Sequence, residues 1–227
     1  MKKQALITGA TSGIGHATAL RLAALGYDII ATGRRAERLA ALKSAIEAQG
    51  GSCRTLCFDV RSEAECRKHL APLDRVALLL TNAGLAAGLE PNDQGSTAKM
   101  LAAGGGHVIN IGSIAGTEPY ENGAVYCASK HAVHAISQAM RADLLSHRIK
   151  VTEIRPGMVE TEFSLVRFHG DQERADKTYT GVEPLTGADI AETIAWIVQL
   201  PAHMNVNDIV LMPAHQAGAY YTCRNTK

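Results

Sequence analysis

The apolar and polar positions of this chain alternate between short β-type runs and amphipathic stretches from the first residues onward. Short apolar runs between turn residues predict strands, and apolar residues three and four positions apart predict helices. Seven strands are expected, at 5–7, 27–32, 54–58, 76–80, 108–111, 151–154 and 209–211. Helices are expected at 15–24, through Leu39, Leu42 and Ile46 up to Gly50, after Ser62, and at 97–103, 124–145 and 188–200.

This order of elements predicts an α/β fold. Strands that alternate with helices indicate βαβ units and therefore a parallel sheet. The run 76–80 is apolar without interruption, as expected for a strand covered on both faces. The predicted fold is a single Rossmann-like doubly wound parallel sheet with helices on both faces. Without internal repeats or linkers, the chain 1–227 is expected to form one domain.

The connection between the fourth and fifth strands is shorter than this fold requires. A parallel crossover needs a helix that runs back across the sheet. The candidate helix 97–103 would be only about 10 Å long, and 88–96 is polar and rich in turn residues. Either the protein has lost most of a helix, or residues near Ser96 and Thr97 are missing from the sequence. We favour the second explanation, which predicts an intact mass well above 24.1 kDa.

Composition excludes several classes of partner. The chain is 46% apolar and 20% charged, as is usual for globular proteins. Its formal charge of +1 does not indicate binding to nucleic acid or to an anionic membrane. It shows no secretory signal and no apolar run of the roughly 18–20 residues that a membrane span needs. Five scattered cysteines without a CxxC pair are expected to be reduced thiols in a cytoplasmic protein.

A glycine-rich turn follows the first strand and opens the first helix. Glycine lets backbone N–H groups approach a pyrophosphate, and the helix N-terminus favours the negative charge. A turn of this kind in this position predicts a dinucleotide site. Its expected cofactor-binding residues are Gly9, Ala10, Thr11, Ser12, Gly13, Ile14 and Gly15.

The end of the second strand favours NADP(H) over NAD(H). NAD sites usually place a carboxylate there for the ribose 2′-hydroxyl, whereas NADP sites place arginine against the 2′-phosphate. Here Arg34 and Arg35 follow the strand, and no acidic residue precedes Glu37. Guanidinium groups bind phosphate through planar, charge-assisted hydrogen bonds. The alternative, a solvated helix start, is disfavoured because positive charge at a helix N-terminus is unfavourable.

Candidate catalytic residues lie on and before the helix 124–145. Tyr126 and Lys130 are four residues apart and therefore share one helix face. A phenol that removes a proton near neutral pH needs a pKa below its usual value of about 10, and a neighbouring ammonium favours the phenolate. Ser113 follows the fifth strand, at the carboxyl edge where α/β folds bind ligands. His131 and His134 lack further ligands nearby in the sequence, so no metal site is expected.

Taken with the turn at Gly9 and with Asn82-Ala83-Gly84 after the fourth strand, this constellation resembles the short-chain dehydrogenase/reductase family over nearly the whole chain. The resemblance implies that Ser113 orients a substrate hydroxyl, that Tyr126 removes its proton, and that Lys130 lowers the Tyr126 pKa and binds the nicotinamide ribose. It also implies further cofactor contacts, at Asn82, Ala83, Gly84, Asp59, Val60, Tyr126, Lys130, Pro156, Gly157, Val159 and Thr161.

Within that family the chain looks most like the NADP-dependent serine and 3-hydroxy acid dehydrogenases. The segments that carry this resemblance are 32–35, 109–116, 156–170, 183–185 and 207–213. It implies hydride transfer between NADP(H) and a small 3-hydroxy acid or its semialdehyde, and a homotetramer. Two alternatives stay open: reduction of larger ketones or aldehydes, and a catalytically idle NADP-binding sensor or scaffold.

One departure and one open assignment accompany this resemblance. The family usually carries a catalytic asparagine on the helix before the fifth strand, where this chain is short. Asn110 lies in the strand itself and is not its equivalent. In the expected substrate loop, about 157–187, Arg167 could pair with a substrate carboxylate, although a surface salt bridge is the favoured interpretation.

Overall fold

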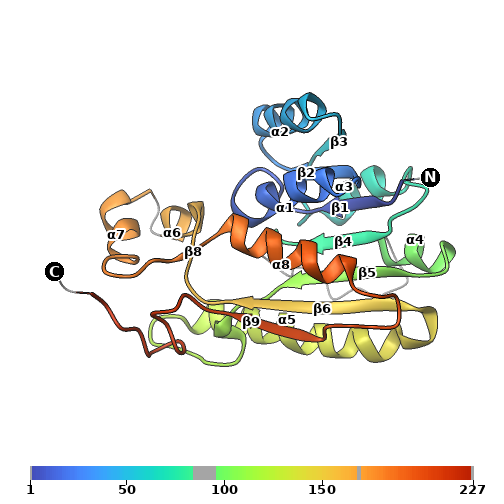
Figure 1. Ribbon diagram of the computed structural model, residues 1–227. Helices are drawn as coiled ribbons and strands as arrows, with labels where there is room; N and C mark the ends of the chain where they lie inside the picture. The colour runs from blue at the N-terminus through green and yellow to red at the C-terminus, as the bar shows by residue number, and fades with distance from the viewer. Residues whose placement is uncertain (1, 84–95, 168–169, 226–227) are drawn as a thin grey trace.

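Seven parallel strands form the central sheet of the computed structural model, which describes residues 2–83, 96–167 and 170–225 (Figure 1). Their order across the sheet is β3-β2-β1-β4-β5-β6-β9, and every neighbouring pair is parallel. The predicted α/β class is confirmed. Their bounds are β1 Gln4–Ile7, β2 Asp28–Gly33, β3 Ser52–Cys57, β4 Leu78–Thr81, β5 Gly106–Ile111, β6 Ile149–Pro156 and β9 Asp208–Leu211.

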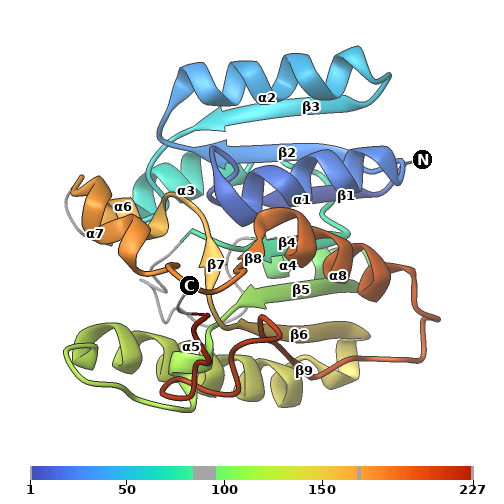
Figure 2. The ribbon, with the colours of Figure 1, turned by 60° about the vertical axis from the view of Figure 1, so that its left-hand side comes forward.

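Helices cover both faces of the sheet (Figure 2). Apolar residues of α1, α2 and α8 pack on one face, and those of α3, α4 and α5 pack on the other. The main helices are α1 Gly13–Ala24, α2 Ala36–Ala48, α3 Glu63–Leu70, α4 Ser96–Ala102, α5 Ala124–Asp143 and α8 Gly187–Gln199. The order of the strands reverses between β1 and β4, and a crevice forms at the carboxyl edge of such a switch point.

The amphipathic patterns predicted the buried helix faces correctly. Leu39, Leu42 and Ile46 of α2 are buried, as are Ile190, Ile194 and Ile197 of α8. Their spacing of three and four residues places each set on one side of its helix, so the same residues that define the periodicity form the core.

The expected substrate loop contains structure that the sequence pattern did not predict. Within it lie β7 Val159–Glu160, α6 Glu162–Arg167, α7 Gln172–Lys177 and β8 Leu185–Thr186. The two strands pair with each other, and α6 and α7 lie beyond the carboxyl ends of the sheet strands (Figure 1). This segment therefore stands over the edge where the ligand crevice is expected.

The crossover between β4 and β5 has a short helix, as its sequence indicated. The helix α4 has seven residues, close to the predicted 97–103, and its Met100 is fully buried. Residues 84–95, which include Gly84, lie outside the described residues.

Two further expectations concern cysteines and membrane spans. All five cysteines lie within the described ranges and are free thiols. Over the same ranges, no helix is both long and apolar enough to cross a membrane.

Candidate active site

The glycine-rich turn after β1 adopts a backbone that requires glycine. Gly9 and Gly13 have φ values of +69° and +54°, in the region that side chains disfavour. A Cβ on Gly15 would clash with the Gly9 carbonyl oxygen and with the Asn82 amide. The turn therefore presents backbone rather than side chains at the start of α1, which is the arrangement that a pyrophosphate needs.

Asn82 ties the end of β4 to this turn. Its side-chain amide donates to the carbonyls of Thr8 and Gly9, both at 3.2 Å. In return, the Thr8 hydroxyl oxygen accepts from the backbone N–H groups of Asn82 and Ala83, at 2.9 and 3.1 Å. Asn82 and Ala83 thus support the turn, whereas Gly84 lies outside the described residues.

Arg35 and Arg38, rather than Arg34 and Arg35, gather at the turn. Arg35 donates to the Thr11 hydroxyl from Nη2 at 2.9 Å and to the Ser12 hydroxyl at 2.8 Å, and its Nη1 binds the Glu162 carboxylate at 2.7 Å. Arg38 binds the same carboxylate. A pocket of about 310 Å³ here is lined by residues of the turn, α1, α2 and α6.

Arg34 points to a different partner. Its Nη1 lies 4.0 Å from the carboxylate of Asp59, which also binds the guanidinium of Arg61. The Arg61 contacts lower the pKa of Asp59 to about 2. Arg38 was missed in the sequence, although it follows Arg35 by three residues on α2 and such residues share a helix face. The glycine turn, the two hydroxyls and the Arg35 guanidinium together fit a dinucleotide with a 2′-phosphate.

The three expected catalytic side chains meet at the carboxyl end of β5. Ser113 is buried just beyond the strand, and its hydroxyl accepts from the Ala115 N–H at 3.2 Å. Ser113 lies close enough to the Tyr126 phenol to oppose, as a hydrogen-bonding group, the rise that burial causes in the pKa of the phenol. Lys130, one turn later on α5, donates from Nζ to the Ile111 carbonyl at 2.9 Å and lies 5.8 Å from the centre of the Tyr126 ring.

The electrostatics of Tyr126 differ from the expectation. Burial raises the pKa of Tyr126, while its hydrogen bond with Ser113 acts in the opposite direction. Lys130 is not among the groups that shift the Tyr126 pKa: its Nζ donates to the Ile111 carbonyl and lies 5.8 Å from the centre of the ring. Burial lowers the pKa of Lys130 to about 8, opposed by the charge of Glu153.

Residues of the segment after β6 surround the phenol. The Phe163 ring lies 5.4 Å from the Tyr126 ring, and the charge of Arg167 acts on Tyr126. Arg167 also stacks on Tyr120, at 5.6 Å from the ring centre. From the sequence, Arg167 was only an open assignment. Phe163 was missed because α6 is too short to be recognised from its pattern, and Tyr120, which precedes α5, carries no motif.

The Pro-Gly segment after β6 leads from the sheet to the turn. Pro156 ends β6, and the Gly157 N–H donates to the Leu211 carbonyl at 2.7 Å. Val159 packs against the core, and the Thr161 side chain lies against Gly13 of the turn. Val60 packs against the core on the other face of the sheet. The segment after β6 is thus positioned between the glycine turn and the Tyr126 phenol.

Three polar residues near the site have structural partners instead. Asn110 accepts from the Thr81 hydroxyl at 2.5 Å and donates to Ser137 at 2.9 Å, so it links β4, β5 and α5. His131 bonds the Cys127 carbonyl of its own helix at 2.9 Å. His134 bonds the buried carboxylate of Glu153 at 2.6 Å.

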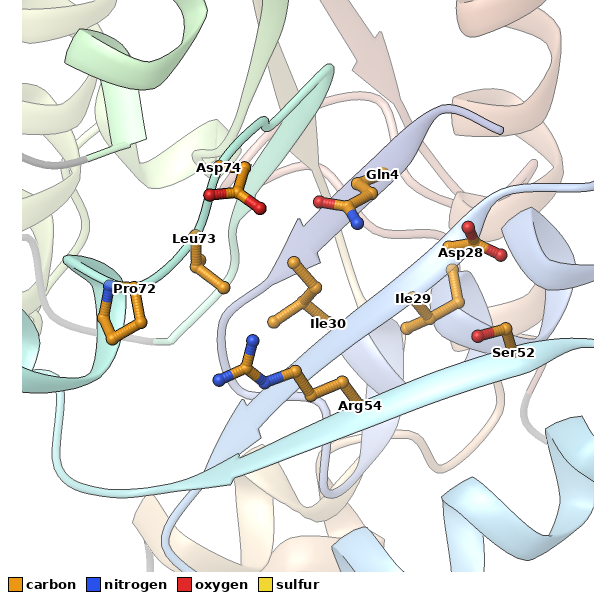
Figure 3. Close-up of a pocket in the computed structure, with 9 residues that line it drawn as sticks. All are labelled: Gln4, Asp28, Ile29, Ile30, Ser52, Arg54, Pro72, Leu73 and Asp74. Carbon is orange, nitrogen blue, oxygen red and sulfur yellow. The ribbon is translucent and has the colours of Figure 1, made fainter. Parts of the chain in front are cut away.

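A second pocket lies far from this chemistry. It has a volume of about 130 Å³ and lies at the amino ends of β1, β2 and β3, facing the residues after α3 (Figure 3). Ligands of open α/β sheets bind at the opposite, carboxyl edge. Its position therefore gives it no part in the site around Tyr126.

Comparisons with known proteins agree with the geometry. The NADP-dependent 3-hydroxy acid dehydrogenase YdfG of Salmonella typhi is 41% identical over 241 residues, covering 94% of this chain and 96% of that protein. A serine 3-dehydrogenase of Rhizobium radiobacter is 41% identical over 239 residues, covering 94% and 95%. The closed form of serine dehydrogenase complexed with NADP⁺ has a TM-score of 0.85 at 38% identity, covering 98% of this chain and 100% of that one.

A family model described as short chain dehydrogenase matches residues 3–99 and 93–171. The two stretches overlap at α4, and the alignment with the Salmonella protein has more positions than this chain has residues. Together these observations indicate that relatives have additional residues in the β4–β5 crossover. By sequence, fold and the placement of its motifs, the chain belongs to the short-chain dehydrogenase family and is an oxidoreductase acting on CH–OH groups.

Proposed function

We propose that the protein transfers a hydride between NADP(H) and a small 3-hydroxy acid, serine-like in size, or its semialdehyde. The observation that carries this proposal is the meeting of Ser113, Tyr126 and Lys130 beside a glycine turn to which Arg35 is hydrogen-bonded. Relatives that share about two-fifths of their residues with this chain are NADP-dependent 3-hydroxy acid and serine dehydrogenases.

The proposed cofactor site uses residues from five segments, at or after the ends of β1, β2, β3, β4 and β6. The turn Gly9–Gly15 would hold the pyrophosphate, and Arg35, Thr11 and Ser12 would hold the 2′-phosphate. Asn82 and Ala83 support the turn, Asp59 and Val60 flank the adenine, and Pro156–Thr161 lie along the nicotinamide. When bound, NADP(H) supplies the hydride acceptor or donor.

The chain's own residues would manage the proton and the substrate. The Ser113 hydroxyl holds the substrate oxygen, and Tyr126 removes the proton from it during oxidation or returns it during reduction. Lys130 binds the nicotinamide ribose, and as an ammonium it favours the Tyr126 phenolate. Since burial raises the Tyr126 pKa in this structure, the phenolate needs this assistance.

Arg167 is proposed to bind the substrate carboxylate. Its charge acts on the Tyr126 phenol, so the guanidinium lies close enough to the phenol to attract the carboxylate of an acid bound there. It also contacts Tyr120 by a 3.3 Å hydrogen bond and by ring stacking. A guanidinium at this position distinguishes hydroxy acids from neutral alcohols.

Following NADPH absorbance against 3-hydroxy acids, semialdehydes and larger ketones tests this function. We expect turnover of serine-like hydroxy acids with NADP⁺ and much slower turnover with NAD⁺. Arg167→Gln should raise KM for hydroxy acids by about 10-fold or more, the usual cost of losing a charged hydrogen bond. It should leave KM for neutral ketones unchanged. Arg174→Gln, an exposed site on α7, is the matched control.

The other outcomes separate the alternatives. Turnover of larger neutral ketones or aldehydes alone would replace the hydroxy acid assignment with the broader reductase. NADPH binding without any turnover would favour the idle sensor or scaffold. Assembly as a homotetramer stays a prediction from the family resemblance, and a cytoplasmic location stays a prediction from the scattered cysteines.

A further inference from the structure

The Glu162 carboxylate lies at the position proposed for the cofactor's 2′-phosphate. Glu162 is the first residue of α6, directly after Thr161 at the glycine turn. Its carboxylate bridges two guanidinium groups. Arg35 lies just before α2, and its Nη1 is 2.7 Å away; Arg38 lies on α2, and its Nη1 is also in contact. Glu162 also lines the 310 Å³ pocket beside Thr11 and Ser12.

The positive charge of the arginines at this site can neutralise only one anion well. Both arginines lower the pKa of Glu162 to about 2, so the carboxylate is ionised at any working pH. Arg35 directs its remaining donors to the Thr11 and Ser12 hydroxyls. A phosphate that takes up the same donors would stand beside the carboxylate, and two anions in one site repel each other.

We infer that Glu162 is an internal competitor for the 2′-phosphate, which NADP(H) must displace from Arg35 in order to bind. This inference rests on the proposed function, because it requires an NADP(H) site at the turn. The residue therefore sets how strongly the enzyme prefers phosphorylated over unphosphorylated dinucleotides. The side chain that weakens this preference comes from the substrate segment, which is far from the turn in sequence.

Equilibrium binding of NADPH and NADH, followed by their fluorescence at constant ionic strength, tests the competition without turnover. Glu162→Gln keeps the size of the side chain and removes its charge. We expect this variant to bind NADPH about five-fold more tightly than the wild type, the range of a partly exposed ion pair, with NADH affinity unchanged. Glu173→Gln, which removes an exposed carboxylate that pairs with Lys177 on α7, is the matched control and should change neither affinity.

The outcomes distinguish this inference from the proposed function. If wild-type protein binds NADH as tightly as NADPH, the NADP(H) assignment fails. If wild type prefers NADPH but Glu162→Gln binds it no more tightly than Glu173→Gln does, Glu162 does not compete and the inference alone is wrong. Weaker NADPH binding by Glu162→Gln would overturn it as well, since the carboxylate would then help to orient Arg35.

Discussion

At the scale of single residues, Lys130 combines a buried ammonium with the proposed chemistry. Its side chain is 9% exposed and its Nζ has the Ile111 carbonyl as a partner. Burial of an ammonium is unfavourable unless it is paired, and here Glu153 opposes that effect only in part. The fold therefore holds a group whose charge is useful at the site but costs stability.

The pH dependence of unfolding checks this. Because the pKa of Lys130 is about 8 when folded and 10.5 ordinarily, the unfolded chain holds more protons between these values, and stability rises with pH there. The cost of the buried ammonium is complete below pH 8 and absent above 10.5. We therefore introduce Lys130→Met into the Tyr126→Phe variant. Its effect on the free energy of unfolding should be more stabilising at pH 7 than at pH 10.5, by about 3 kcal/mol.

Denaturant titrations of the single and double variants supply the comparison, and the Tyr126→Phe background removes the titration of the phenol. An effect of Lys130→Met that is the same at both pH values would contradict the lowered pKa.

At the scale of elements, helices with a long periodic pattern were predicted from the sequence, and short helices were not. Helices such as α2 and α8 show several apolar residues on one face, and both were predicted, for α2 with its buried residues named individually. The helices α6 and α7 have six residues each, too few for a periodicity to appear. They depend on tertiary contacts, such as the Tyr179 hydroxyl with Ser164 at 2.6 Å and with the Val159 carbonyl at 3.0 Å.

The same limit explains what was missed at the site. Ser113 follows the regular strand β5, and Tyr126 and Lys130 lie on the long helix α5. The sequence therefore placed the three residues together. Phe163 and Glu162 belong to α6, and their contacts with Tyr126 and Arg35 could not be predicted without it. The choice between Arg34 and Arg38 as the second arginine depends on side-chain directions around the start of α2, which neither charge nor spacing alone decides.

The short crossover before β5 makes a prediction of its own. Trypsin cleavage after Arg75 and after Lys99 should release the peptide 76–99, which contains all of β4 and the start of α4. If residues are missing from the sequence near Ser96, this peptide will be absent and the intact mass will exceed 24.1 kDa. Peptide sequencing that finds 76–99 intact would show that the deletion is genuine and that the family's asparagine-bearing helix has been lost.

At the scale of the whole molecule, the strand order determines which segments meet. Reversal between β1 and β4 places the turn after β1, Asn82 after β4 and Ser113 after β5 at one edge of the sheet. The helix α5 then brings Tyr126 and Lys130 to that edge, and the segment after β6 covers it (Figure 2). Cofactor support and proton transfer thus come from different elements and can be separated experimentally.

The Tyr126→Phe variant tests the central claim most directly, by measuring NADPH affinity and turnover on the same preparation. The substitution removes only the hydroxyl that exchanges a proton with the substrate. We predict that NADPH affinity is retained while turnover of the best hydroxy acid falls by at least about 100-fold, the usual contribution of a general base. Turnover at the wild-type rate would contradict the assignment of Tyr126, and with it the proposed mechanism.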